Sequence, residues 1–293
     1  DFDKDGDLDF YLVNHRPDFE NTGRLNMRIE KSYSKLSSDI LYRNDGTHFT
    51  EVTRNAGLVN KAWGLSASIG DFNGDDWPDV YVCNDFLTPD MLYINNKNGT
   101  FTNEILTSMN HISFSSMGSD YADLNNDLLP DLFVLEMASE DHVRSKQNMA
   151  TMNTNNFNNL VKNKYHHQYM VNTLQLNRGS GKFSEVAQIS GLAKTDWSWA
   201  PLIADFDNDG LKDIFITNGI LKDMANQDFR TALKKSFSQK KKPTFKEITA
   251  LQPSTKLSNY SFKNEGDFNF KNTSKDWGLE KMTQSNGAAY ADF

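Results

Sequence analysis

The stretch that decides the fold is DFDNDGLKDIFITN, residues 205–218, in which an acidic loop runs directly into an apolar, β-branched segment. Three further stretches align with it: DFDKDGDLDFYLVN from Asp1, DFNGDDWPDVYVCN from Asp71 and DLNNDLLPDLFVLE from Asp123. A fifth copy begins at Asp292, so successive starts lie 70, 52, 82 and 87 residues apart. A unit of about 50 residues that carries insertions has the size of one propeller blade or one solenoid turn.

Each unit repeats one order of elements around its acidic loop. Small and apolar residues precede the loop, as in GLSASIGD and WAPLIAD, and an apolar run follows it, as in VYVCN and IFITN. A hairpin then follows, indicated by an apolar run ending in Asn, a Gly turn and a Phe, as in MLYINNKNGTF. Four antiparallel strands per unit are the make-up of a propeller blade. We therefore predict an all-β fold, a β-propeller of four-stranded blades.

The unit boundaries predict one propeller segment over residues 1–293. The chain opens inside one motif and stops as the motif restarts, so we expect it to be a fragment of a larger propeller. The surplus length falls between the second and third strands of a unit, in insertions at 14–39, 139–171 and 219–259, two of which are partly helical in pattern. These insertions emerge on the face opposite the acidic loops, and inserted elements on one face are where repeat proteins bind.

The acidic loops have the spacing of a metal site. In D-x-[DN]-x-D-x-x-x-D, side-chain oxygens stand at positions 1, 3, 5 and 9, and the carbonyl of position 7 can complete the shell. Such a set suits Ca²⁺, which takes six to eight oxygens at about 2.3 to 2.6 Å. The candidate ligands are Asp1, Asp3, Asp5 and Asp9; Asp71, Asn73, Asp75 and Asp79; Asp123, Asn125, Asp127 and Asp131; and Asp205, Asp207, Asp209 and Asp213.

Other interpretations of these loops remain open. An EF-hand is excluded, because it needs flanking helices and a Glu at position 12, which here lies in a predicted strand. Solvated turns and catalytic acid pairs are alternatives, although four recurrences in one register favour a structural ion. Position 6 is glycine in two loops but Asp76 and Leu128 in the others, so we expect the loop at Asp123 to bind its ion most weakly.

Aromatic residues on the connectors between units are candidate ligand-binding groups. Rings beside polar groups can stack on sugars or anchor a protein partner, although packing between blades is the alternative for the tryptophans. The candidates are Trp63, Phe114, Trp197 and Trp199. His166 and His167 suggest a metal site only weakly, because adjacent helical residues diverge and no third ligand is evident.

The composition excludes several classes of partner. The formal net charge is −8 over 293 residues, and the acids are clustered, so nucleic acid is a poor partner. No stretch is long and apolar enough to span a membrane. The single cysteine, Cys83, permits no intrachain disulfide, and we expect it to be buried in a strand.

The motifs LYRNDGTHFTEVT, GDFNGDDWPDVYVCNDF, TDWSWAPLIADFDNDGLKDIFITNG and SNGAAYADF resemble the FG-GAP repeat of integrin α-subunit propellers and the related VCBS repeat. They are most similar to the large VCBS/FG-GAP proteins of Bacteroidetes, which often carry an ASPIC/UnbV domain and are related to cartilage acidic protein. The resemblance covers nearly the whole chain. It implies a propeller, Ca²⁺ in the loops between the first and second strands, and an exported, surface-associated protein.

Three functions follow as hypotheses. The first is a secreted or cell-surface binding module without catalysis, in which calcium stiffens the loops and the inserted face recognises a protein or glycan. The second is a carbohydrate-active enzyme, which needs an acid or histidine constellation outside the repeated loops. The third is a passive spacer within a larger surface protein.

Overall fold

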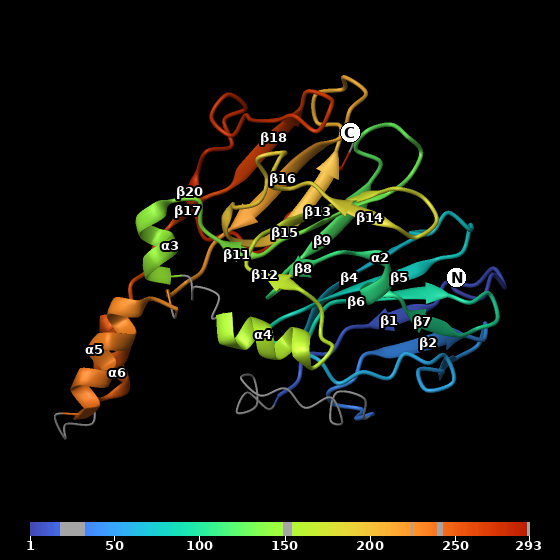
Figure 1. The fold of residues 1–293 in the computed structure, drawn as a ribbon, viewed down its shortest axis with the longest axis horizontal. Coiled ribbons are helices and arrows are strands. Elements are labelled where there is room, and N and C mark those ends of the chain that lie inside the picture. Colours follow the sequence, from blue (N-terminus) through green and yellow to red (C-terminus); the bar gives the residue numbers. More distant parts are fainter. Residues whose placement is uncertain (18–32, 149–153, 224, 239–242, 292–293) are drawn as a thin grey trace.

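The computed structural model describes residues 1–17, 33–148, 154–223, 225–238 and 243–291, and these residues build four antiparallel sheets that follow one another side by side in chain order (Figure 1). The first sheet consists of β1 (Phe10–Leu12), β2 (Ile40–Asn44) and β3 (Phe49–Glu51), and the second of β4 (Gly64–Gly70), β5 (Asp79–Asn84), β6 (Met91–Asn95) and β7 (Phe101–Asn103). The third consists of β9 (Ser119–Ala122), β10 (Asp131–Val134), β13 (Thr173–Asn177) and β14 (Phe183–Glu185). The fourth consists of β15 (Asp196–Ala204), β16 (Asp213–Asn218), β18 (Tyr260–Asn264) and β19 (Phe270–Asn272), with β11 (Met137–Ala138) added beside β15.

This arrangement confirms the predicted all-β, propeller-like fold. Each acidic loop joins the first two strands of a sheet or, for the first sheet, leads into β1. The predicted restart at Asp292 lies outside the described residues, as do parts of the three insertions, namely 18–32, 149–153, 224 and 239–242.

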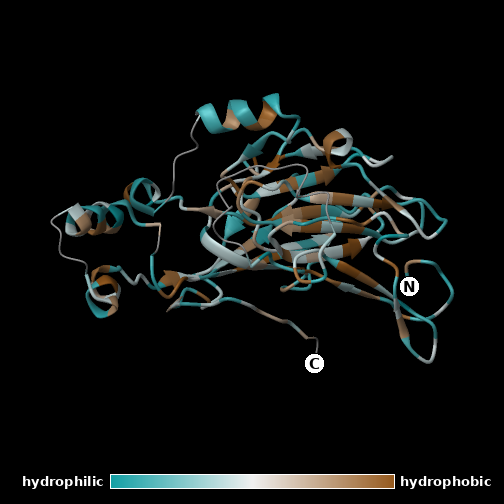
Figure 2. Ribbon diagram, turned by 90° about the horizontal axis from the view of Figure 1, so that it is seen from below, coloured by the Kyte–Doolittle hydropathy of each residue, from teal (hydrophilic) through white to brown (hydrophobic). Residues whose placement is uncertain are grey.

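The hydrophobic core lies between neighbouring sheets. Along β5, Val80 and Val82 face the first sheet, whereas Tyr81 and Cys83 face the third, as the alternation of a strand requires. Cys83 is buried, as predicted. Figure 2 shows the hydrophobic residues concentrated along the stacked strands, which is where burial from water stabilises the assembly.

A repeated asparagine links each sheet to the preceding one. It ends the third strand of a unit, and its side-chain amide donates to the carbonyl of position 2 in the preceding acidic loop. The bonds are Asn95 Nδ2 to Phe2 O at 2.8 Å, Asn177 Nδ2 to Phe72 O at 3.1 Å, and Asn264 Nδ2 to Leu124 O at 2.8 Å. These amides tie together segments that lie 93, 105 and 140 residues apart in the chain.

The described residues of the predicted insertions 139–171 and 219–259, which we call the crown, extend from one end of the sheets (Figure 1). They contain helices, as predicted, and the first Asp loop lies at the other end of the molecule. The crown helices are α3 (His142–Asn148), α4 (Thr154–Lys162), α5 (Gln227–Ser238) and α6 (Phe245–Leu251), and α2 (Ile105–Ser108) lies outside it. Two small pairs complete the fold, β8 (Ile112–Ser113) with β12 (Gln168–Tyr169) and β17 (Leu257–Ser258) with β20 (Met282–Thr283).

Candidate metal loops and the opposite face

The first Asp of each loop holds the turn in shape. In the second loop, Asp71 Oδ1 accepts the backbone N–H of Gly74 at 2.8 Å and of Asp75 at 3.0 Å, and Oδ2 accepts that of Asp76 at 2.7 Å. The fourth loop repeats this with Asp205, which accepts from the residues at positions 5 and 6. Such side-chain acceptance stabilises a compact loop by replacing bonds to water.

Position 6 adopts a left-handed backbone in every loop, with φ values of 98° at Gly6, 66° at Asp76, 69° at Leu128 and 91° at Gly210. Glycine adopts this region freely, whereas a residue with a Cβ pays roughly 1–2 kcal/mol. Leu128 is also 90% exposed. The sequence prediction that Leu128 weakens ion binding at its loop remains a prediction, and the backbone strain supplies its physical basis.

The last Asp of each loop bonds the loop to the third strand of its sheet. Asp79 is fully buried; its Oδ2 accepts the N–H of Phe72 at 2.9 Å and its Oδ1 that of Asn95 at 2.8 Å. The same pair of bonds recurs at Asp9, Asp131 and Asp213. Burial, together with repulsion from the other acids of the loop, raises the pKa of Asp79 and of Asp131 to about 6. These carboxylates close the loop onto the third strand, whether or not they also contact an ion.

Two loops already gather their carboxylates closely enough for a cation. One oxygen each of Asp1, Asp3 and Asp9 lie within 4.8 Å of one another, and so do oxygens of Asp205, Asp207 and Asp209. In the first loop Asp3 Oδ1 is buried and has no hydrogen-bond partner among the described residues, and burial raises the Asp3 pKa. An unpaired buried carboxylate oxygen is costly, so this donor set fits a hard cation.

Lysines and amides satisfy some of the remaining acids. Lys263 Nζ contacts Asp209 Oδ2 at 2.8 Å and also pairs with Asp207, and Lys97 Nζ lies 3.3 Å from Asp75 Oδ2. In the second loop the amide of Asn73 donates to Asp75, and Asn125 does the same for Asp127 in the third. In the first loop one carboxylate oxygen, Asp3 Oδ1, remains buried without a hydrogen-bond partner among the described residues.

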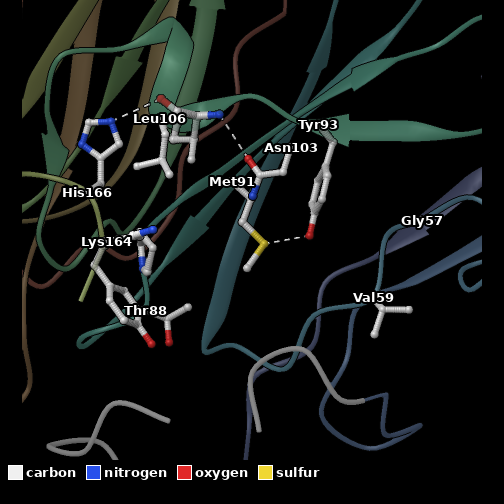
Figure 3. Close-up of a pocket in the computed structure, with 12 residues that line it drawn as sticks. Gly57, Val59, Thr88, Met91, Tyr93, Asn103, Leu106, Lys164 and His166 are labelled. Atoms are coloured by element: carbon white, nitrogen blue, oxygen red, sulfur yellow. Dashed lines mark hydrogen bonds between the residues drawn. The ribbon is translucent and has the colours of Figure 1, made fainter. Parts of the chain in front are cut away.

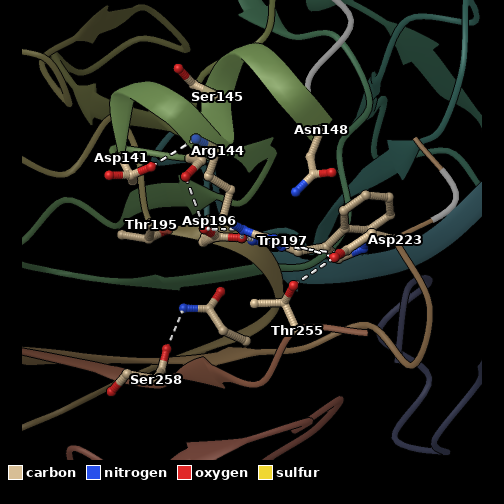
Figure 4. Close-up of polar contacts among 12 residues, drawn as sticks. Asp141, Arg144, Ser145, Asn148, Thr195, Asp196, Trp197, Asp223, Thr255 and Ser258 are labelled. Carbon is tan, nitrogen blue, oxygen red and sulfur yellow. Dashed lines mark hydrogen bonds and ion pairs between the residues drawn. The ribbon is translucent and has the colours of Figure 1, made fainter. Parts of the chain in front are cut away.

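At the opposite end, one half-buried arginine ties the two described insertions to the fourth sheet (Figure 4). Arg144 of α3 donates through Nε to Asp196 Oδ2 at 2.7 Å, and its Nη2 lies 3.3 Å from Asp223 Oδ1. Thr255 donates to Asp223 at 2.7 Å. Asp196 has a φ of 77°, so the chain accepts backbone strain at this point.

A cavity of about 410 Å³, lined by both polar and apolar groups, opens beside this ion pair. It lies between α3, α5 and the segment after α6. The polar side chains that line it include Arg144, Gln147, Asp223, Asn226 and Asp228, and the ring of Phe229 contributes an aromatic wall. Because Asp196 and Asp223 outnumber Arg144, and Asp228 adds to them, the surroundings carry net negative charge.

The four candidate aromatics do not form one surface. Trp63 is 1% exposed, with the Arg16 guanidinium 4.2 Å from its ring centroid and Phe86 against its edge. Trp197 is buried in a small cluster with Ile220 and Leu257, and Trp199 packs against it. These environments favour the packing alternative for the tryptophans. Phe114 is half-buried.

The ring of His166 is held by contacts with the backbone. Its ring nitrogens contact the carbonyls of Ile105, Met109 and His167 at 3.1 to 3.3 Å, and burial lowers its pKa. This geometry gives His166 a structural role in place of the weakly suggested metal site.

Sequence reasoning missed the buried acids at the crown end. Glu136 is fully buried and accepts the N–H groups of Phe114, Ser115 and Met137. Burial raises the pKa of Glu136 to about 8. A signal was present, because the other three units have Asn at this place, as in VYVCN, where the third has LFVLE.

The sheets, their repeated Asp loops and the linking asparagines define a propeller-like repeat protein. The FG-GAP-like repeat family matches residues 1–82, 71–134 and 160–216, so the chain belongs to this family. None of the helices among the described residues has the length and apolar character needed to cross a membrane.

No curated protein matches the chain. Among solved structures, a lectin of Agrocybe aegerita, described as recognising non-reducing terminal N-acetylglucosamine, is similar over 80% of this chain at 14% identity, with a TM-score of 0.38. The chain spans 45% of that lectin's length. At this TM-score the likeness supports no conclusion about a ligand.

Proposed function

We propose that this chain is a calcium-binding propeller module of an exported or cell-surface protein, and that it binds a protein or glycan through the crown without chemistry of its own. The finer resemblance to the Bacteroidetes VCBS proteins with ASPIC/UnbV domains is part of this proposal. Two physically separate ends support it: repeated acidic loops at one end, and non-repeated polar elements at the other.

The observation that carries the binding role is the crown cavity. Its polar side chains come from two insertions of different units, and the ion pairs of Arg144 with Asp196 and Asp223 hold those insertions together. A preformed concave surface with several polar groups is what a specific ligand requires, because little ordering remains to be done on binding.

The observation that supports calcium is the unpaired oxygen of Asp3 among the gathered acids of the first loop. A bound divalent ion would neutralise carboxylates that repel one another and would hold the turn against Asp9, the last Asp of the loop. Calcium then contributes stability to the sheets and leaves the crown free to bind.

The calcium proposal is tested by titrating the chelator-treated protein with Ca²⁺ in a calorimeter and following its thermal midpoint. Asp3→Asn and Asp207→Asn are the variants of choice, because Asn at this position can keep the turn, as Asn73 does in the second loop by accepting the N–H of Asp75 at 3.1 Å. Each should lower affinity at its own loop about tenfold or more. Asp7→Asn is the matched control, because Asp7 is an exposed acid that is expected to contribute only its backbone carbonyl, which the substitution keeps. Unchanged binding in both variants, or no calcium effect on the midpoint, would refute the proposal.

The binding role is tested with immobilised glycan and protein panels. Gln147→Ala and Asp228→Ala remove exposed groups from the crown cavity, and Glu265→Ala is the acidic control at the other end. Retention that only the crown variants weaken supports the module. Retention unaffected by them places the binding surface elsewhere, and no retention favours a spacer.

A second candidate function is an enzyme. The observation in its favour is that Asp196 and Asp223 form an acid pair outside the repeated loops. Both are ion-paired with Arg144. Cleavage of a glycan by the wild type, abolished in Asp223→Asn, would establish this function and overturn the binding module.

A further inference from the structure

A second cavity, of about 550 Å³, lies beside the second sheet and apart from both the Asp loops and the crown cavity (Figure 3). Its walls come from four segments: 57–59 before β4, 88–93 leading into β6, 103–106 at α2, and 164–166 after α4. Cavities of about 300 to 1,000 Å³ are typical of small-molecule sites.

Most of this lining is apolar. The apolar side chains are Val59, Pro89, Met91, Tyr93, Ile105 and Leu106. The Tyr93 hydroxyl is turned to Met91 Sδ at 2.8 Å, as Figure 3 shows, so the ring presents carbon to the cavity. An occupant must therefore have an apolar body.

The polar groups of the lining are predominantly donors. Thr88 is 1% exposed, and its hydroxyl has no hydrogen-bond partner among the described residues. The Asn103 oxygen accepts from Leu92 N at 3.3 Å and Ile105 N at 3.2 Å, so its amide nitrogen is the atom that can donate to a ligand. Lys164 adds a cation. Within the described residues no carboxylate lines this cavity.

We propose that the cavity binds a small aliphatic carboxylate. The chain of the ligand fills the apolar part, and its carboxylate accepts from Thr88 and pairs with Lys164, which lie on the same side of the cavity in Figure 3. A buried hydroxyl without a partner is a desolvation penalty in the free protein, and a ligand acceptor removes that penalty on binding. The site is separate from the Asp loops and from the crown cavity, although Lys164 itself belongs to the crown.

The test is calorimetric titration of the whole chain with decanoate and with decyltrimethylammonium, which have the same chain and opposite head charges. Decanoate should bind at one site and at least about tenfold more tightly than the cation. Thr88→Val should weaken decanoate about three- to tenfold, the effect of one hydrogen bond, while leaving the thermal midpoint equal or higher. Lys164→Gln should weaken decanoate similarly, and Lys162→Gln, an exposed lysine outside the lining, should not.

Unchanged decanoate affinity in Thr88→Val would overturn the proposal, whatever the effect of the substitution on the midpoint. Equal affinity for the two amphiphiles, or no binding of decanoate, would overturn it as well. Leu106→Asp provides a variant that does not disturb the core, because Leu106 is 59% exposed. It places a carboxylate at the cavity and should repel decanoate while favouring the cation.

Discussion

The asparagine link between sheets gives the sharpest prediction about stability. Asn177 is 2% exposed; its Nδ2 donates to Phe72 O and Pro130 O, both at 3.1 Å, and its Oδ1 accepts Gly179 N at 2.9 Å. Asn177→Ala therefore removes three bonds and leaves two carbonyls unpaired. At about 1 kcal/mol for each bond, with a further penalty for the unpaired groups, we expect a loss of about 2–4 kcal/mol.

The loss is measured by urea unfolding at constant calcium. With a slope of about 3 kcal/mol/M, the midpoint should fall by about 1 M. Asn177→Asp should be worse than Asn177→Ala, because it turns an acceptor toward two carbonyls. Gln188→Ala, which truncates an exposed amide, is the control. A midpoint for Asn177→Ala within about 0.2 M of the wild type would show that the link does not stabilise the stack.

Three further predictions concern single residues. Leu128→Gly should stabilise the protein by up to about 1 kcal/mol in urea unfolding, because it relieves the positive φ, and a destabilised variant would contradict this. Since burial raises the Glu136 pKa from 4.5 to about 8, the folded state holds a proton that the unfolded chain releases. The free energy of unfolding should therefore fall as pH rises between those values, and Glu136→Gln should flatten that slope in urea titrations at several pH values. Arg144→Met leaves Asp196 and Asp223 without their cation and should lower the free energy of unfolding by about 3–5 kcal/mol. Hydrogen exchange in α3 should become faster, and unchanged exchange would argue that the ion pairs do not hold the crown.

Much of the fold could be predicted because its strands and turns depend on local sequence patterns. The strands after the Asp loops follow from apolar, β-branched runs, and the hairpins follow from the Asn and Gly turns. Helix α6 was missed although its signal was present: Thr244 and Glu247 form a capping box, the T-x-x-E pattern of a helix start.

The acidic loops, which are candidate metal sites, were equally easy to recognise, since all candidate oxygens of a loop lie within nine residues. Their sequence could not reveal that Asp79 and its counterparts accept backbone N–H groups with both oxygens, or that Lys263 pairs with Asp207 and Asp209, which lie 56 and 54 residues before it. The aromatic candidates show the same limit: the sequence offered Trp63 and Trp197 as candidate ligand-binding groups, and only the tertiary packing shows that both rings are buried.

The sequence by itself determined the class of fold, the repeat, and the acidic loops, because each depends on residues close together in the chain and recurs in register. Only the tertiary structure decided the contacts between units: Asn264 with Leu124 across 140 residues, Arg144 with Asp196 and Asp223 across 52 and 79, and the walls of both cavities. The physical reason is that insertions follow no period. The contacts of an insertion depend on where the stacked sheets place it in space, and no local sequence pattern predicts that position.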